Sequence, residues 1–218
     1  MELPAYWLPR PVAPTSRALR AEFDEVLDRA IAAGPDRPID YRVDAPKWQF
    51  LCHAADRAEH VLHGSGNPGI AEFTPRTPDD PTAFGGRHAV FAAADGVWPV
   101  FYAVLDRARV PLMCNGCVRF GGEARYYFSI SAPALALRPW RTGTVYLLPA
   151  ATFELEPPNG GIRPVQVASP VPVRPVAKLT VGPEDFPFRD DVHGHVDEDL
   201  AARVAADPDG FPWHEPAA

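Results

Sequence analysis

The stretch HVLHGSG, residues 60–66, decides the fold that we expect for this chain. Its first five residues have the composition of a short β-strand. Gly64, Ser65 and Gly66 then open a loop that continues to residue 86. A loop longer than about 12–15 residues is commonly functional or mobile. The end of this strand is therefore the first place to look for a ligand-binding wall.

Upstream of this strand the sequence predicts two helices. The first covers TSRALRAEFDEVLDRAIAAG, with Thr15 or Ser16 as the N-cap and Gly34 closing its C-terminus. A second, short helix begins at Pro46 and includes KWQFLCHAADR. We assign residues 1–57 to an N-terminal helical segment packed on the core. The apolar residues that share one face of the first helix are Leu19, Phe23, Val26, Leu27 and Ile31.

Downstream of the loop the pattern changes from strand to helix and back to strand. Residues 88–93 suit a buried strand, Asp95 or Gly96 turns the chain, and a helix with an apolar stripe follows from Val97 to Leu105. Three later strands are predicted in ARYYFSISA, GTVYLLPA and VAKLTV. Because helices come early and strands late, the fold class is α+β. Residues 58–188 form the predicted core, and residues 189–218 an acidic, partly flexible tail.

Composition restricts the possible partners. The 27 prolines among 218 residues are more than twice the usual share of about 5%, which predicts long connections and edge strands. A net charge of −7 disfavours broad binding to nucleic acid or anionic membranes. We see neither an apolar run of the roughly 20 residues that span a bilayer nor a secretory signal. Three cysteines are too few for a disulfide framework, so we expect a soluble, cytoplasmic protein.

Three elements follow one another along the chain in an informative order. They are His63-Gly64-Ser65 at a strand end, the strand AVFAA, and Tyr102 on the next helix. This order resembles the ADP-ribosyltransferase-like fold. The nicotinamide pocket of that fold is marked by His-Gly-Thr/Ser, then by an aromatic-x-Ala strand, then by a second aromatic on a helix. Phe91 stands where that strand usually has tyrosine, and Tyr102 matches the stacking tyrosine of the poly-ADP-ribosylating branch. GTVYLLP and VAKLTVGPEDFPF also resemble later strands of bacterial proteins that we associate with this fold.

The resemblance covers roughly residues 58–188 and implies a split antiparallel β-sheet with an N-terminal helical segment. It also implies NAD, as co-substrate, or a related ADP-ribose-containing ligand. In such a site Phe91 or Tyr102 would stack on the nicotinamide ring. Gly64, beside Ser65, would let the ligand approach the backbone, and His63 would donate to a ribose hydroxyl. The expected partner is a nucleotide-type small molecule, and the macromolecular acceptor is open.

One position departs from the family pattern. A glutamate near the start of a late strand stabilises the cation-like ribose in that family, whereas the matching region here, GGIRPVQVASPVPV, offers Gln166. We therefore keep three hypotheses: an ADP-ribosyltransferase or NAD hydrolase lacking the usual glutamate, a catalytically silent binding module on the same scaffold, and an enzyme similar to RNA 2′-phosphotransferases. The third would need phosphate contacts, for which the candidates are Arg76, Arg87, Arg119 and Arg125.

Two further motifs are typical of metal sites, but neither makes a complete one. CNGC, Cys114 to Cys117, is half of a zinc knuckle, with Cys52 and His53 as the remaining candidates. No second pair with ligand spacing appears, so a tight turn at CNGC is the favoured interpretation. HGH, residues 193–195, could bind a metal together with His214 but is equally well explained as surface histidines. We predict no metal.

Overall fold

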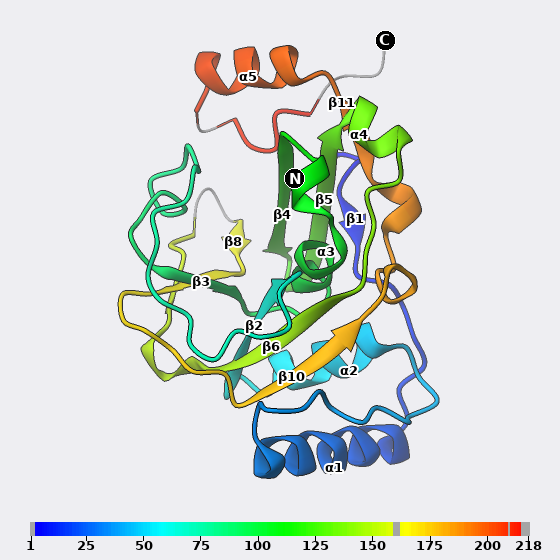
Figure 1. Cartoon of the computed structure of the whole chain (residues 1–218). Helices are drawn as coiled ribbons and strands as arrows, with labels where there is room; N and C mark the ends of the chain where they lie inside the picture. Colours follow the sequence, from blue (N-terminus) through cyan, green and yellow to red (C-terminus); the bar gives the residue numbers. More distant parts are fainter. Residues whose placement is uncertain (1–2, 159–161, 209, 215–218) are drawn as a thin grey trace.

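The computed structural model describes residues 3–158, 162–208 and 210–214. Two largely antiparallel sheets and, among these residues, five α-helices form a mixed α+β fold (Figure 1). The helices are α1 (Arg17–Ala33), α2 (Lys47–Asp56), α3 (Trp98–Val104), α4 (Ala132–Ala136) and α5 (Asp197–Ala206). The strands are β1 (Leu8–Pro9), β2 (His60–Ser65), β3 (Val90–Ala93), β4 (Met113–Phe120), β5 (Glu123–Ser131), β6 (Gly143–Pro149), β7 (Glu154–Leu155), β8 (Arg163–Pro164), β9 (Gln166–Ser169), β10 (Ala177–Val181) and β11 (His193–His195).

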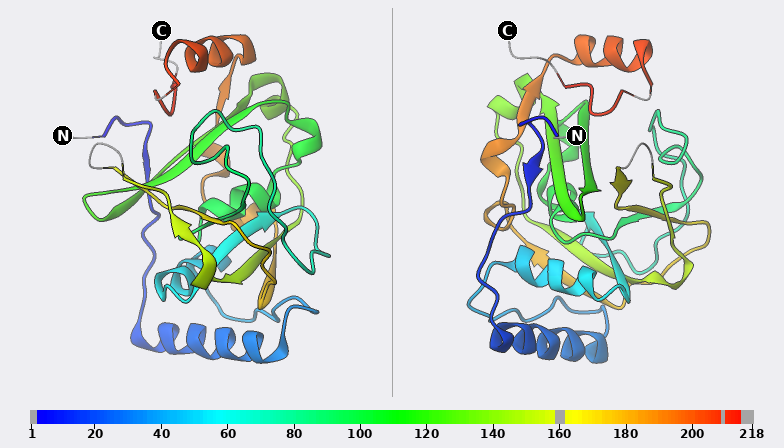
Figure 2. Two further views of the ribbon diagram at one scale, coloured as in Figure 1. Left: turned by 90° about the vertical axis from the view of Figure 1, so that its left-hand side faces the viewer. Right: turned by 180° about the vertical axis from the view of Figure 1, so that it is seen from behind.

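The two sheets meet at one residue and diverge from it. The six-stranded sheet has the order β10-β6-β2-β3-β9-β7, and the other has the order β1-β5-β4-β8, with β11 parallel to β5. Val165 lies between β8 and β9. Its N–H donates to Cys117 O at 3.2 Å, and its carbonyl accepts from Ala94 N at 2.8 Å. Helix α3 lies between the diverging sheets (Figures 1 and 2).

The six-stranded sheet has two differently covered faces. Its inner face carries Leu62, Ala93 and Leu147, which pack in the main core together with α3. Its outer face carries Val61 and Tyr146, which belong to a separate apolar cluster. The alternation of side chains along each strand therefore tells on which side of this sheet any given residue lies.

Helix α1 confirms the predicted caps and most of the predicted stripe. Ser16 Oγ accepts from Leu19 N at 3.0 Å, and Gly34 ends the helix with φ 77°. The prediction for Ile31 was wrong, because it is 36% exposed while Ala30 is 8% exposed. Ala30 follows Val26 and Leu27 at helical spacing, and Ile31 lies about 100° further round the axis. Figure 1 shows α1 as the outermost layer, below α2.

Helix α3 confirms the predicted change from strand to helix. Asp95 turns the chain, as expected, and its Oδ1 accepts from Val97 N at 2.8 Å and Trp98 N at 2.9 Å. It therefore satisfies two N–H groups at the start of the helix that have no partner within it. The predicted apolar stripe is fully buried at Val97, Val100, Phe101, Val104 and Leu105.

The acidic C-terminal segment contributes a strand that the sequence pattern did not reveal. β11 pairs with β5, His193 facing Ser129 in the register. Helix α5 follows and buries Leu200 in an apolar cluster with Trp7 and Tyr127. This cluster covers the face of the four-strand path β1-β5-β4-β8 that points away from the main core, because its Val118 and Tyr127 alternate with Cys117 and Tyr126 of that core.

Candidate functional site

His63 holds β2 and β3 together. Its Nδ1–H donates to the backbone oxygen of Phe91 at 2.7 Å, which fixes the tautomer because a carbonyl only accepts. The ring lies on the outer face, opposite Tyr146 in the register and 4.6 Å from the ring of Phe73. Burial lowers the pKa of His63, so the imidazole is neutral at pH 7. Its geometry is that of a clamp between two strands.

Gly64 is required by the helix that lies against it. A Cβ at this position would lie 1.8 Å from Pro99 O, so only glycine admits the backbone of α3. Gly143, on β6, meets the same helix in the same way, 1.9 Å from Ala103 O. Ser65 serves the turn that follows, since its Oγ accepts from Asn67 N at 3.1 Å. All three residues of the His-Gly-Ser motif thus make internal contacts.

Tyr102 and Phe91 lie on the other side of the sheet from the His63 ring. Tyr102 is half-buried on α3, where burial raises its pKa to about 12 and a hydrogen bond with Asn115 opposes the rise. Trp98 Nε1–H donates to Asn115 Oδ1 at 2.6 Å, which fixes that amide. Phe91 packs beside the ring of Phe84 at 6.3 Å. The structure therefore places the two aromatic candidates on the inner side and separates them from the imidazole.

Gln166 begins β9 on the inner face, and it has a carboxylate as its neighbour. It faces Ala93 in the register, and its backbone oxygen accepts from Glu156 N at 3.0 Å. The register Leu155↔Val167 extends through this bond, so Glu156 and Gln166 point to the same side. Sequence reasoning could not place Glu156 in the site, because it precedes Gln166 by ten positions and the sequence does not specify how the chain returns between them.

The Glu156 carboxyl group keeps its proton to a higher pH than an ordinary glutamate, because its pKa is raised. Burial, and after it the charge of Asp80, raise its pKa to about 7. Among the residues that the structure describes, no donor bonds to this carboxyl. The charge of Asp80 also raises the pKa of Tyr102. Its effect is smaller than that of burial and than the lowering effects of Asn115 and Arg107. Asp80 is itself held by its own turn, where Oδ1 accepts from Thr82 N at 2.9 Å. The long loop thus brings an acid near both residues.

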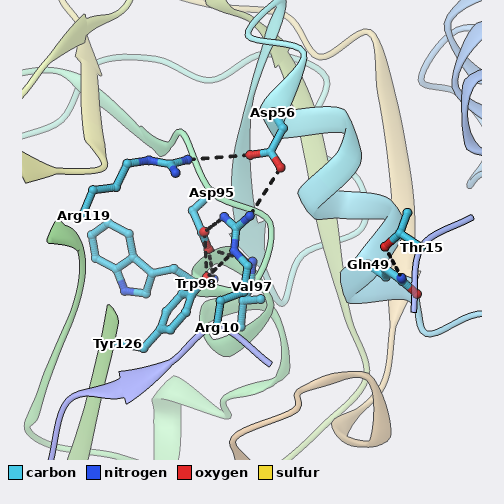
Figure 3. A network of polar contacts seen from close by, with 9 residues as sticks. All are labelled: Arg10, Thr15, Gln49, Asp56, Asp95, Val97, Trp98, Arg119 and Tyr126. Atoms are coloured by element: carbon cyan, nitrogen blue, oxygen red, sulfur yellow. Dashed lines mark hydrogen bonds and ion pairs between the residues drawn. The ribbon is translucent and has the colours of Figure 1, made fainter. Parts of the chain in front are cut away.

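A second polar group lies at the start of α3 and is satisfied internally (Figure 3). Asp95 is fully buried, and its Oδ2 accepts from Arg10 Nη2 at 2.7 Å and from the Tyr126 hydroxyl at 2.8 Å. With the two backbone donors at Oδ1, this carboxylate has four partners. Burying a charge is tolerable only with such pairing. This network fixes the N-terminal segment, α3 and β5 relative to one another.

The four arginines considered as phosphate contacts do not converge. Arg119 and Arg125 lie on β4 and β5, one pointing to the inner side and one to the outer side. Arg76 and Arg87 belong to the segment before β3, where Arg76 pairs with Ala89 through the backbone. Three of the four side chains, those of Arg87, Arg119 and Arg125, are each paired with a carboxylate.

The CNGC motif is part of a strand, so the predicted tight turn was wrong. Cys114 and Cys117 both lie on β4, three residues apart, and their side chains leave opposite faces of the sheet. One metal ion could not bind both. Gly116 is explained by packing, because a Cβ there would lie 2.5 Å from the Phe211 ring. In the C-terminal segment His195 is buried against Ser129, with Nδ1 at 2.5 Å from Oγ.

Comparison with known proteins identifies no relative: no family model, no curated protein and no solved structure matches the chain. Among the described residues, no helix has the length and apolar character that crossing a bilayer requires.

Proposed function

We propose that this protein binds NAD, or a related ADP-ribose-containing ligand, on the inner side of the six-stranded sheet, with Tyr102 and Glu156 as the principal contacts. The single observation that carries the proposal is the position of Glu156. It stands beside Gln166 through the 3.0 Å backbone bond, where the resemblance to ADP-ribosyltransferase-like proteins leads us to expect an acid. The fold expected from that resemblance, a sheet split into two parts, belongs to the same proposal.

Each residue of the proposed site has its own role. Tyr102 and Phe91 offer aromatic faces for the nicotinamide ring, and the Gln166 amide offers a donor and an acceptor to a ribose hydroxyl. Glu156 supplies the negative charge that stabilises a positively charged ribose as the bond from its C1′ to the nicotinamide nitrogen breaks. The electron pair leaves with nicotinamide, and water or an acceptor nucleophile attacks C1′ and gives up a proton. His63 positions Phe91 through its backbone oxygen rather than touching the ligand.

The Glu156 carboxyl group, which has no hydrogen-bond donor beside it in the part of the chain that the structure describes, is the reason for expecting an NAD-type ligand at this site. Glu156 is half-buried and meets no donor among the described residues, and carboxyl groups with raised pKa values cluster at functional sites. Its raised pKa, about 7, also predicts a pH dependence. The ionised form is the active one, so NAD cleavage rises with pH through about 7.

The test measures binding and cleavage in the same variants. Thermal melting with NAD, ADP-ribose and nicotinamide reports binding, and chromatographic quantification of released nicotinamide reports cleavage. We expect Tyr102→Ala to abolish the thermal shift and Tyr102→Phe to retain it. Glu156→Gln is expected to lower the cleavage rate by about a hundredfold, as for the loss of one electrostatic contact to a transition state.

Glu154 provides the matched control. It lies two residues away on β7, its side chain is 66% exposed, and its partner is Arg87 at 3.3 Å. Glu154→Gln should leave cleavage unchanged. Absence of a shift with all three ligands would exclude the proposed site, and equal loss in the two glutamate variants would remove Glu156 from it.

A second candidate is a binding module without turnover. Gln166 favours it, because an amide carries no charge to stabilise the ribose cation. A thermal shift with NAD and no release of nicotinamide at pH 8, where Glu156 is ionised, would support this candidate over the enzyme.

A further inference from the structure

A cavity of about 550 Å³ opens where α2, β2 and β4 approach one another. Its polar lining consists of Arg10, Asp56, His60 and Arg119, and small apolar side chains complete the wall. The volume falls within the range of small-molecule sites, about 300–1,000 Å³. Its Arg10 also bonds to Asp95, so the cavity adjoins the Asp95 network, and Figure 3 shows Arg10, Asp56 and Arg119 together.

Two guanidinium groups in this cavity share one loosely held carboxylate. Asp56 approaches Arg10 Nη1 at 3.3 Å and Arg119 Nη2 at 3.6 Å, both longer than the roughly 2.7–2.9 Å of strong charge-assisted bonds. Its side chain is 51% exposed. Asp56 also ends α2, where the helix dipole disfavours a negative charge. Arg10 Nη2 is held by Asp95 at 2.7 Å, so Arg10 Nη1 and the Arg119 guanidinium are the groups available to an anion that binds better than Asp56.

His60 contributes to the wall of this cavity a buried ring nitrogen that lacks a hydrogen-bond partner within the described ranges. The residue is 8% exposed, and its Nδ1 is buried with no hydrogen-bond partner among the described residues. Burial lowers its pKa, so the neutral ring carries one N–H. A buried polar atom left unpaired costs stability that a bound ligand would recover.

We propose that this cavity binds a phosphate group, free or as part of a small phosphate ester, held between Arg10 and Arg119 in place of the Asp56 carboxylate. Paired guanidinium groups match the geometry of phosphate oxygens, and the unpaired His60 side chain supplies a further contact to the ligand. The site is independent of the NAD site proposed above, since it shares no residue with it.

The experiment titrates the full chain with sodium phosphate and with glycerol 3-phosphate, at constant ionic strength set by sodium chloride. Isothermal calorimetry gives affinity, and the thermal midpoint gives a second readout. We expect both probes to bind wild type, with tighter binding of the ester if an esterified phosphate is the ligand, and equal or weaker binding if free phosphate is.

Two variants should move the affinity in opposite directions. Arg119→Gln removes one guanidinium and should weaken binding about tenfold, the loss of one charge-assisted hydrogen bond. Asp56→Asn removes the internal competitor and should tighten binding several-fold. A purely structural role for this cluster would not produce opposite signs.

Arg125→Gln is the control for loss of surface charge. Arg125 lies on the adjacent strand, points to the other face and pairs with Glu123 at 2.8 Å, so its loss should leave the affinity unchanged. The proposal is overturned if wild type shows no more response to the probes than to chloride. It is equally overturned if Arg125→Gln weakens binding as much as Arg119→Gln, or if Asp56→Asn weakens it.

Discussion

Asp95 at the start of α3 and Glu156 beside β9 are two carboxylates with different surroundings. Asp95 is fully buried and accepts from four donors. Glu156 is half-buried on the β7–β9 edge, where burial and Asp80 raise its pKa to about 7. A carboxylate with all its oxygens paired holds elements together, whereas one without donors is costly for the fold and available for chemistry.

The same contrast extends to the residues around each carboxylate. Asp95 caps the start of α3 through two backbone N–H groups, and Gly64 lies in contact with the backbone of the same helix at Pro99. Glu156 is instead held through its backbone, whose N–H donates to Gln166 O at 3.0 Å. The motif that first suggested a ligand wall therefore lies in the tightly packed region, and the carboxylate that suits the proposed chemistry lies in the other.

The largest effect is expected from Asp95→Ala. Without this carboxylate the partly buried Arg10 guanidinium loses its 2.7 Å ion pair and keeps the longer 3.3 Å contact with the Asp56 carboxylate, and α3 loses its cap. The free energy of unfolding should therefore fall by about 3–5 kcal/mol. Urea denaturation followed by tryptophan fluorescence measures it. Asp56→Asn, on an exposed side chain, should change stability by less than about 0.5 kcal/mol. A loss below about 1 kcal/mol for Asp95→Ala would mean that the network is not what fixes α3.

A smaller loss is expected from Gly64→Ala. The added methyl would meet Pro99 O at 1.8 Å, and such overpacking costs about 1–3 kcal/mol, more where backbone must move. Gly69→Ala is the matched control, because its nearest atom would lie 3.5 Å away. If Gly64→Ala instead left stability intact and reduced only ligand binding, Gly64 would belong to the ligand site, and the contrast between the two regions would fail.

Local patterns predicted much of the architecture. Helices α1 and α3 and the strands β2, β5, β6 and β10 follow from periodicity and capping, which are properties of neighbouring residues. The prediction failed where distant contacts decide. Asn115-Gly116 has turn composition, yet it lies within β4 because Trp98 bonds to the asparagine and Phe211 packs on the glycine.

The candidate site was less predictable for the same reason. The His-Gly-Ser motif gave the position of β2 but not which side of the sheet each side chain faces, which depends on the register with β3 and β6. Glu156 and Asp80 acquire their importance from an antiparallel return and a long loop. No spacing in the sequence encodes the meeting of Arg10, His60 and Arg119 around one cavity.

The smallest expected effect is a change in the free energy of unfolding that comes from ionising Glu156. It tests the comparison of Glu156 with Asp95 most directly. Its pKa is raised from 4.5 to about 7 in the folded state, so the folded protein binds more protons than the unfolded chain between these values. Stability therefore falls as the pH rises through this interval. Glu156→Gln lacks this loss. Relative to wild type it should be unchanged near pH 4 and more stable at pH 8, on the order of 1 kcal/mol after discounting for solvent screening.

Denaturation of wild type, Glu156→Gln and Glu154→Gln at both pH values measures this difference. The Glu154 variant should show none, because that side chain is 66% exposed. If Glu156→Gln gained no stability between pH 4 and pH 8, the carboxyl would have an ordinary pKa. The physical reason for assigning chemistry to the β7–β9 edge would then disappear.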